Sequence, residues 1–353
     1  MTSKNKISQH YVPPSVPSVV RPSTISNLYF ALRSQHRNIW NFFTVWWKYK
    51  KQPDFPLVVQ LQTVNRCNAN CKMCPYGSTT ATGALLQMSD QLYDQLVAEL
   101  AAEKSFRMLV LSFQNDPLVD KKLVARAKKF KQVAPDKKLE IVTNGSLLSQ
   151  KLVEQLYPYL DRVHVSIHAW TSDTHREVMG GLSLKRIKEN LDFIATFKPW
   201  REKTILRFVR QKDNVHEYST FKKYWNRRGF GVFSFDLNSR LGAVQNFASI
   251  ALNRTWWQRT KLWVLRVLNP ILIPFCPVPN TTMYIRSTGE VVFCFNDWTN
   301  KNILGSVKKA TIRQIFHSPK VVALRNRINA NKAFVDDVCS DCDLYKDAMW
   351  LNL

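Results

Sequence analysis

Three cysteines close together are the residues of this sequence best suited to bind a metal cluster. They have the spacing Cys67-x3-Cys71-x2-Cys74 and follow a predicted strand. Three thiolates in a short loop can bind three irons of a four-iron, four-sulfur cluster, and no fourth cysteine lies nearby. The remaining iron would then keep an open coordination site for a small chelating ligand. A zinc site and a ferredoxin-type electron carrier are the alternatives for the same residues.

A second cysteine group lies in the C-terminal part of the chain. Cys276 and Cys294 flank Gly289, and the pair Cys339-x2-Cys342 follows. Four thiolates can saturate a second iron–sulfur cluster, and they can equally form a structural zinc site. A cluster with four protein ligands has no open iron for a substrate, so its expected task is to accept or relay an electron.

The cysteines and the N-terminus indicate a reducing compartment. The seven cysteines are an odd number in clustered spacings, which suits metal ligation better than disulfide bonds. The first residues are polar and contain several prolines, without the apolar segment of a secretory signal. We therefore expect a cytoplasmic location.

Short β-branched runs alternate with amphipathic helical stretches from residue 57 onward. The predicted strands are 57–64, 108–113, 139–143, 163–168, 205–209 and 232–237. The predicted helices are 89–103, 121–133, 149–158, 183–197 and 216–228. This order predicts an α/β fold, a partial (β/α)6 barrel whose chemistry lies at the C-terminal strand ends. Two short strands around Gly289, followed by a helix, predict a small α+β domain at the C-terminus.

Changes of composition predict four segments. Residues 1–53 form a basic, partly disordered extension with an amphipathic helix, and residues 54–239 form the barrel. Residues 240–275 form a basic, aromatic insert, and residues 276–353 form the domain of the second cluster.

The motif Cys67-x3-Cys71-x2-Cys74, in its position after the first strand, resembles the radical S-adenosylmethionine (SAM) superfamily. The resemblance implies that the amino and carboxylate groups of SAM occupy the fourth iron of a 4Fe-4S cluster. Electron transfer from the cluster then breaks a carbon–sulfur bond of SAM and releases a 5′-deoxyadenosyl radical, chemistry that belongs to the cofactor. Reduced flavodoxin or ferredoxin would supply the electron.

Residues near the ends of the predicted strands resemble the SAM-binding segments of that family. Gln114, Asn115 and Asp116 stand where the family usually has Gly-Gly-Glu before proline; Asp116 would replace the acid that holds the SAM amino group, and both glycines are absent. The other residues expected to contact SAM are Asn144, Ser166, His168, Arg207 as a partner of the carboxylate, and Tyr76 after the cluster loop. Each could instead be a turn former, a satisfied polar group of the barrel lining or a packed aromatic.

The C-terminal residues resemble the SPASM/Twitch auxiliary module. The resemblance includes residues 282–294, 303–307 and 312–319 and the four cysteines Cys276, Cys294, Cys339 and Cys342. The full SPASM pattern continues with further cysteines, which this sequence lacks. The resemblance therefore implies one auxiliary 4Fe-4S cluster in addition to the SAM-binding cluster.

These features predict a radical SAM enzyme that abstracts hydrogen from its substrate. Oxidation or dehydrogenation is favoured over epimerisation, because no eighth cysteine is present to return a hydrogen atom. The expected substrate is a sugar, a cyclitol, a lipid-linked molecule or another small anion. A peptide-modifying (RiPP) maturase is the alternative enzyme, and an iron–sulfur electron-transfer protein or a zinc-stabilised binding protein is the alternative of another class.

The charge is strongly positive, with 51 Lys and Arg against 26 Asp and Glu and a formal net charge of +25. Residues 1–53 and 240–275 contain eight and five basic residues and no acidic one. A basic amphipathic pattern from Leu28 to Trp46, and the tryptophans of the insert, predict peripheral binding to an anionic membrane surface at its inner face. Solvated basic side chains beside packed aromatics are the alternative. Nucleic acid is disfavoured as a partner, because no recognised binding motif accompanies the charge.

Overall fold

The computed structural model describes residues 53–80, 83–253, 256, 260, 276, 278–329, 339, 342 and 343. The chain divides into two compact units, residues 1–48 and 49–353, and every described residue belongs to the second. The basic helix predicted from Leu28 to Trp46 and most of the insert at 240–275 lie outside the described residues. Within the described residues, no helix has the length and apolarity needed to cross a bilayer.

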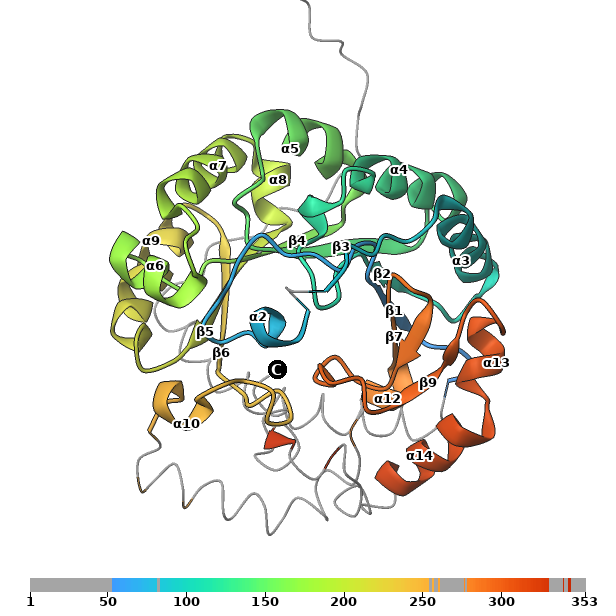
Figure 1. The fold of residues 1–353 in the computed structure, drawn as a ribbon. Helices are drawn as coiled ribbons and strands as arrows, with labels where there is room; N and C mark the ends of the chain where they lie inside the picture. Colours follow the sequence, from blue (N-terminus) through green and yellow to red (C-terminus); the bar gives the residue numbers. More distant parts are fainter. Residues whose placement is uncertain are drawn as a thin grey trace, which may run out of the picture. The chain divides into compact units, whose positions relative to one another are not determined.

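Six parallel strands form the centre of the fold (Figure 1). They are β1 Val58–Leu61, β2 Met108–Val110, β3 Lys138–Thr143, β4 Arg162–Ser166, β5 Thr204–Arg210 and β6 Gly231–Asp236. Each strand pairs in parallel with the next one along the chain, so that the order is β6-β5-β4-β3-β2-β1. This arrangement confirms the predicted partial barrel, although β1 and β2 are shorter than the predicted strands.

Helices connect successive strands and lie on the outer side of the curved sheet (Figure 1). They are α3 Asp90–Ala102, α4 Leu123–Val133, α5 Gln150–Leu156, α6 Ser172–Met179, α7 Leu184–Thr196, α8 Lys198–Glu202 and α9 Tyr218–Arg227. Short 3-10 helices η1 Pro117–Val119, η2 Tyr157–Tyr159 and η3 Val215–Glu217 lie between them. Ser89, Ser149, Thr171 and Ser183 cap four of these helices by accepting a backbone N–H of the first turn, which explains where the helices begin. The helices α6 and α8 were not predicted.

The strands are buried by the helices that cover them. Val59, Leu109, Ile141, Val165 and Phe208, one from each of the first five strands, are fully buried in one apolar core. Such near-continuous burial is typical of parallel sheets covered by helices. The sheet is therefore a rigid platform for side chains at its edge.

The C-terminal strands extend the same sheet. They are β7 Thr282–Ile285, β8 Glu290–Val292 and β9 Ile303–Ser306, and the nearby helices are α12 Val278–Thr281, α13 Ile312–Phe316 and α14 Pro319–Asn329. Strand β7 pairs in parallel with β1, whereas β8 pairs antiparallel with β7 on one side and with β9 on the other. The predicted hairpin around Gly289 is confirmed, and Gly289 adopts the left-handed φ of 89° that its turn requires.

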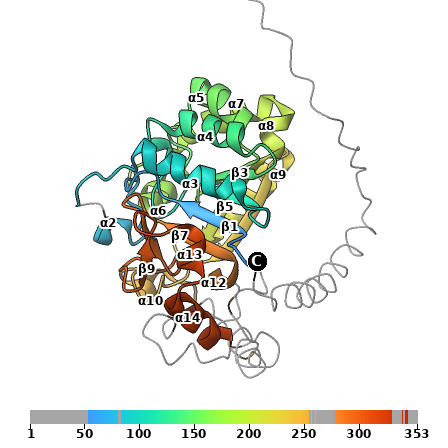
Figure 2. The same cartoon turned by 90° about the vertical axis from the view of Figure 1, so that its right-hand side faces the viewer.

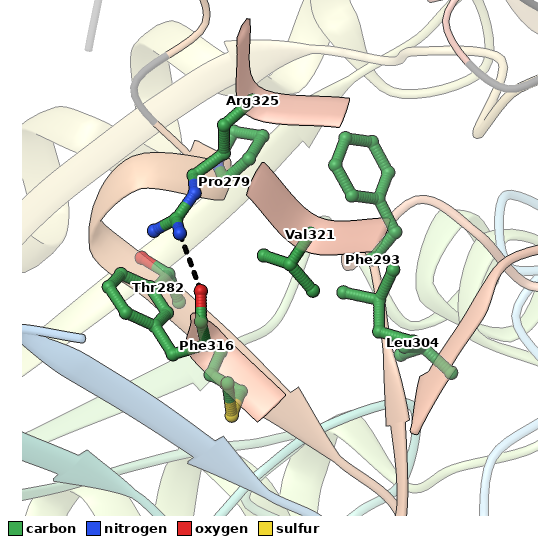
Figure 3. Close-up of a pocket in the computed structure, with 9 residues that line it drawn as sticks. Pro279, Thr282, Phe293, Leu304, Phe316, Val321 and Arg325 are labelled. Atoms are coloured by element: carbon green, nitrogen blue, oxygen red, sulfur yellow. Dashed lines mark hydrogen bonds between the residues drawn. The ribbon is translucent and has the colours of Figure 1, made fainter. Parts of the chain in front are cut away.

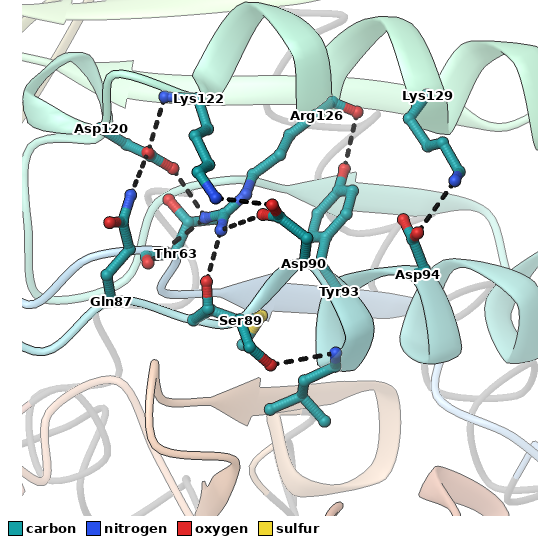
Figure 4. A network of polar contacts seen from close by, with 12 residues as sticks. Thr63, Gln87, Ser89, Asp90, Tyr93, Asp94, Asp120, Lys122, Arg126 and Lys129 are labelled. Carbon is teal, nitrogen blue, oxygen red and sulfur yellow. Dashed lines mark hydrogen bonds and ion pairs between the residues drawn. The ribbon is translucent and has the colours of Figure 1, made fainter.

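A buried ion pair joins α3, α4 and the turn that follows β2 (Figure 4). The Arg126 guanidinium of α4 lies 2.7 Å from an Asp120 carboxylate oxygen, and both side chains are almost fully buried. Arg126 also donates to the backbone carbonyls of Thr63 and Met88. Asp120 accepts further hydrogen bonds from Gln87 and from a backbone N–H. The network thus fixes the loop that begins at Gln114.

Candidate active site

One cavity of about 220 Å³ lies at the C-terminal ends of the barrel strands. Figure 2 shows β1 pointing toward this side of the barrel, where the short helix α2 (Tyr76–Thr79) also lies. Nine of the residues that sequence reasoning selected line the cavity: Cys67, Cys71, Cys74, Asn115, Asp116, Asn144, Ser166, His168 and Arg207. These side chains therefore meet at the C-terminal ends of the barrel strands, where sequence reasoning expected the chemistry.

The cysteine loop is held on one side by the C-terminal end of α6. The backbone N–H of Lys72 donates to the carbonyl of Val178 over 3.0 Å, and the Cys71 Sγ lies 3.7 Å from the Met179 Sδ. Lys72 also forms ion pairs with Glu177 and Asp213 at the surface. This helix therefore sets the position of the second cysteine.

The other side of the cysteine loop is held by the turn after β3. The side-chain amide of Asn68 donates to the Ser146 hydroxyl over 2.8 Å. The side-chain amide of Asn144 donates to the side-chain oxygen Oδ1 of Asn68, also over 2.8 Å. The backbone N–H of Asp116 donates to the Arg66 carbonyl over 3.0 Å. Loops that follow β1, β2 and β3 are thus joined to one another by direct hydrogen bonds.

The donor set of the loop fits an iron–sulfur cluster. Burial raises the pKa of the Cys67 thiol to about 12, and burial followed by the neighbouring thiolate of Cys74 raises the pKa of Cys71. Buried thiols of this kind stay protonated unless a metal replaces the proton. Among the described residues, no three Cys, His, Asp or Glu side chains converge on a single ion. Ligands of a four-iron cluster bind different irons, so these thiols need not converge on one point.

Asp116 is buried and uses both carboxylate oxygens within the protein. It accepts hydrogen bonds from the backbone N–H groups of Leu118 and Asn144, over 3.0 and 2.8 Å, and from the Thr143 hydroxyl. Burial raises the pKa of Asp116 more than these hydrogen bonds lower it. The carboxylate therefore clamps the turn after β3 against the loop after β2.

His168 is a neutral side chain at the floor of the cavity. Burial, and next the charge of Arg207, lower its pKa to about 3. Its Nδ1 accepts the backbone N–H of Val209 over 3.0 Å, which leaves the proton on Nε2. The residue has a left-handed φ of 59°, and Asn214 stabilises this backbone by donating to the carbonyl of His168.

Arg207 contributes a positive charge to the cavity. It lies opposite Ser166 in the pairing of β5 with β4. Its Nε is buried without a hydrogen-bond partner, and its guanidinium lies 5.9 Å from the centre of the Phe235 ring. Burial lowers the pKa of Arg207 to about 10, so the side chain remains charged at neutral pH.

Two of the residues that were expected to contact SAM do not line the cavity. Tyr76, the first residue of α2, is buried in the protein. Gln114 has a left-handed φ of 55°, and its side-chain amide donates to the carbonyl of Asp297 over 3.0 Å. Gln114 therefore connects the loop after β2 with the C-terminal segment.

Asn238, Arg240 and Trp298 are among the lining residues that were not selected from the sequence. Asn238 and Arg240 follow the end of β6, and Trp298 follows Cys294 in the C-terminal segment. The sequence analysis assigned Arg240 to the basic insert, whereas the structure places its side chain in the cavity. Its position just after a barrel strand is the signal that could have identified it.

The second cysteine group lies near the same cavity. Cys276, Cys294 and Cys339 pack around one small apolar cluster that contains Phe293 and Ile328. Burial raises the pKa of the thiols of Cys276, Cys294 and Cys339, and neighbouring thiolates of this group raise it further. The Cys294 Sγ accepts the backbone N–H of Asn296 over 3.5 Å. Cys276 is close to the thiols of Cys294, Cys339 and Cys342, and four thiols near one another fit a fully ligated cluster.

A second void lies between β7, β8 and α14 (Figure 3). It has a volume of only about 10 Å³, and Arg325 points into it and donates to the carbonyl of Phe316. A space of this size has room for about one water molecule. It is a packing defect around a buried arginine and not a ligand site.

Fold and site together define an iron–sulfur enzyme built on a partial barrel. Residues 61–198 match the Radical SAM superfamily, and residues 276–343 match SPASM, an iron-sulfur cluster-binding domain. The chain therefore belongs to the radical SAM superfamily, in its SPASM/Twitch-type group, and its cofactors are 4Fe-4S clusters and SAM.

Several known proteins are similar over most of their length. An S-adenosyl-L-methionine-dependent 2-deoxy-scyllo-inosamine dehydrogenase from Niallia circulans is 21% identical over 287 residues, 81% of this chain and 92% of that protein. The structure of BtrN in complex with AdoMet and 2-DOIA has a TM-score of 0.54 at 18% identity, covering 81% and 92% of the two chains. Streptococcus suis SuiB bound to its precursor peptide SuiA has a TM-score of 0.59 at 13% identity, covering 96% and 79%. The two solved structures share the fold.

Proposed function

We propose that this radical SAM enzyme oxidises a hydroxyl group of a sugar or cyclitol to a carbonyl group. Cys67, Cys71 and Cys74 would hold the reduced cluster, and SAM bound there would supply the 5′-deoxyadenosyl radical chemistry that takes a hydrogen atom from the carbon that carries the hydroxyl. The hydroxyl group then loses its proton and the carbon loses one electron, so that a ketone forms. The reaction therefore needs an electron acceptor beside the substrate.

The position of the second cysteine group carries this proposal. Trp298, four residues after Cys294, lines the same cavity as the first cysteine group. The Arg240 side chain lines the cavity and donates over 2.8 Å to the side chain of Asn296, two residues after Cys294. A fully ligated cluster at this position would accept the electron that the substrate loses. The dehydrogenase from Niallia circulans, similar over 81% of this chain, supports the same reaction class.

The remaining roles follow from the geometry of the cavity. We propose that Cys67, Cys71 and Cys74 bind the catalytic cluster, and that Arg207 pairs with the SAM carboxylate. Other proposed contacts of SAM come from the lining residues Asn115, Asn144, Ser166 and His168. Asp116 would shape this site through its bonds to Thr143 and Asn144. Reduced flavodoxin or ferredoxin is the proposed electron donor, and the cytoplasm is the proposed location.

Modification of a peptide is the second candidate function. It is supported by the similarity in fold to SuiB, whose structure contains a precursor peptide. The two candidates differ in the substrate that increases SAM cleavage.

The test is anaerobic incubation of the reconstituted enzyme with SAM, a reductant and candidate polyols. We expect 5′-deoxyadenosine and an oxidised polyol in equal amounts. Cys71→Ala should abolish 5′-deoxyadenosine formation, whereas Cys294→Ala should still cleave SAM but release little oxidised product. Zinc in place of about eight irons, or full turnover by Cys71→Ala, would overturn the proposal. Deuterium uptake from solvent without net oxidation would indicate epimerisation instead.

A further inference from the structure

Two arginine side chains, Arg207 and Arg240, line the same cavity. Burial lowers the pKa of Arg207, and the charge of the nearby Arg240 lowers it further. Arginine keeps its proton under all ordinary conditions. The cavity therefore contains two positive charges on side chains from β5 and from the loop after β6.

Within the described residues, neither guanidinium forms an ion pair with a carboxylate. Arg210, on the same strand as Arg207, differs in this respect, since its guanidinium lies 2.8 Å from an Asp236 carboxylate oxygen. The carboxylate that does line the cavity, that of Asp116, accepts its hydrogen bonds from Leu118, Thr143 and Asn144. Among the residues that the structure describes, both arginines thus lack a hydrogen-bonded counter-charge.

Arg240 retains donors for a ligand. Its Nη1 donates to the Asn296 amide oxygen over 2.8 Å, and its guanidinium lies 5.5 Å from the centre of the Phe295 ring. A guanidinium has five N–H donors in a planar fork, so this single bond leaves most of them unused. Burial lowers the pKa of Arg240 more than the negative charges of Cys74, Asp343 and Cys294 raise it.

The backbone of Arg240 is held in a strained conformation. Arg240 and Leu241 have left-handed φ angles of 53° and 57°, a region that non-glycine residues seldom adopt. The Asn238 side chain accepts the backbone N–H of Arg240 over 3.1 Å and stabilises this turn. Consecutive strained residues persist where the surroundings fix them, and they are frequent at ligand sites.

We propose that Arg240 binds an anionic group of the substrate, so that the polyol oxidised by this enzyme carries a phosphate. This inference rests on the proposed function. SAM has one carboxylate, for which Arg207 suffices, so the remaining N–H donors of Arg240 are available to a second anion. A planar guanidinium matches the oxygens of phosphate and carboxylate. The anion would hold the substrate between the two cysteine groups.

The experiment measures binding to the reconstituted, SAM-loaded enzyme without reductant, so that it does not depend on whether the polyol is oxidised. The probes are glycerol 3-phosphate and myo-inositol 1-phosphate, each compared with its neutral polyol. We expect each phosphate to bind at least about tenfold more tightly than its neutral counterpart, as for a charge-assisted hydrogen bond. Arg240→Gln should remove this difference, and Arg240→Lys should retain part of it. Arg210→Gln, a change on strand β5 outside the cavity lining, should leave the difference intact.

Equal binding of charged and neutral probes, or no phosphate-dependent binding by any probe, would overturn the proposal. Loss of SAM affinity in Arg240→Gln would also overturn it, because Arg240 would then belong to the SAM site. If Arg240→Gln does not fold, Arg240→Lys and the wild-type comparison still decide. Vesicles with and without phosphatidylinositol then distinguish a lipid-linked phosphate from a free one, and preference for either source supports an anion subsite.

Discussion

Gly180, at the end of α6, packs against the backbone of Asn70 in the cysteine loop. A β-carbon at position 180 would lie 2.1 Å from the Asn70 carbonyl oxygen. Gly180 also has a left-handed φ of 65°. The residues are far apart in the sequence, and their contact fixes the loop between Cys67 and Cys71.

Gly180→Ala should therefore impair assembly of the catalytic cluster. The β-carbon cannot fit unless the cysteine loop moves, and an alanine at this φ costs a further 1–2 kcal/mol, roughly. We expect the variant to lose about four of eight irons after reconstitution, measured as iron and sulfide per chain. Gly181→Ala is the matched control, because Gly181 has a φ of 92° but nothing within 4 Å of its β-carbon position. A full iron content in Gly180→Ala would show that the loop adapts.

Arg126→Met should strongly destabilise the barrel. The change leaves the Asp120 carboxylate, whose side chain has 0% exposure, without its charged partner. Removal of one partner from a buried ion pair costs about 3–5 kcal/mol. The measurement is the free energy of unfolding in urea.

Arg325→Met provides the control for this prediction. Arg325 is also buried, yet among the described residues its guanidinium donates to the carbonyl of Phe316 alone, and Nε and Nη1 have no hydrogen-bond partner there. Methionine keeps the packing of the stem, so the free energy of unfolding should change by less than about 1.5 kcal/mol. An equal decrease in the free energy of unfolding in both variants would show that the ion pair with Asp120 contributes no additional stability.

Much of the cavity could be predicted because parallel strands end at one edge. Cys67, Asp116, Asn144 and His168 follow or end different predicted strands, Arg207 lies within another, and the structure places all of them in one lining. Their order along the chain was sufficient for this inference. Their individual contacts with SAM remain predictions.

The rest depends on backbone conformations that residue types do not reveal. Gln114 has a left-handed φ, which directs its side chain to Asp297 instead of the cavity. Arg240 was assigned to the insert from its charge, although its position just after the last barrel strand could have identified it as a lining residue. The contact between Gly180 and Asn70 joins distant segments and could not be predicted from local patterns.

Glu217→Gln should destabilise the protein at neutral pH and much less in acid. Burial raises the pKa of Glu217, but hydrogen bonds from Thr171, Trp170 and Thr174 outweigh it and lower the pKa overall. A lowered pKa means that the carboxylate contributes stability above its ordinary pKa of about 4.3 and loses it as the pH falls through the folded value. These hydrogen bonds hold the start of α6, whose other end contacts the cysteine loop.

The expected difference between wild type and Glu217→Gln is about 1–3 kcal/mol at pH 7, measured by urea unfolding. It should stay constant down to about pH 5 and shrink only below about pH 4.3. Glu154→Gln on α5, an exposed position, is the matched control and should show no difference. A difference that already shrinks between pH 7 and pH 6 would assign the effect to another group.

Asp116→Asn should weaken SAM binding by disturbing the turn after β3. An asparagine amide at this position has only one acceptor oxygen, whereas three donors face the carboxylate, from Leu118, Thr143 and Asn144. At least one backbone N–H then loses its acceptor, at a cost of about 1–3 kcal/mol. We expect a dissociation constant for SAM at least about fivefold higher in the reconstituted enzyme. Asp94→Asn removes a surface carboxylate that pairs with Lys129 outside the cavity lining, and it should leave SAM affinity unchanged. Unaltered SAM affinity in Asp116→Asn would show that the clamp between these two loops is not needed for the cofactor site.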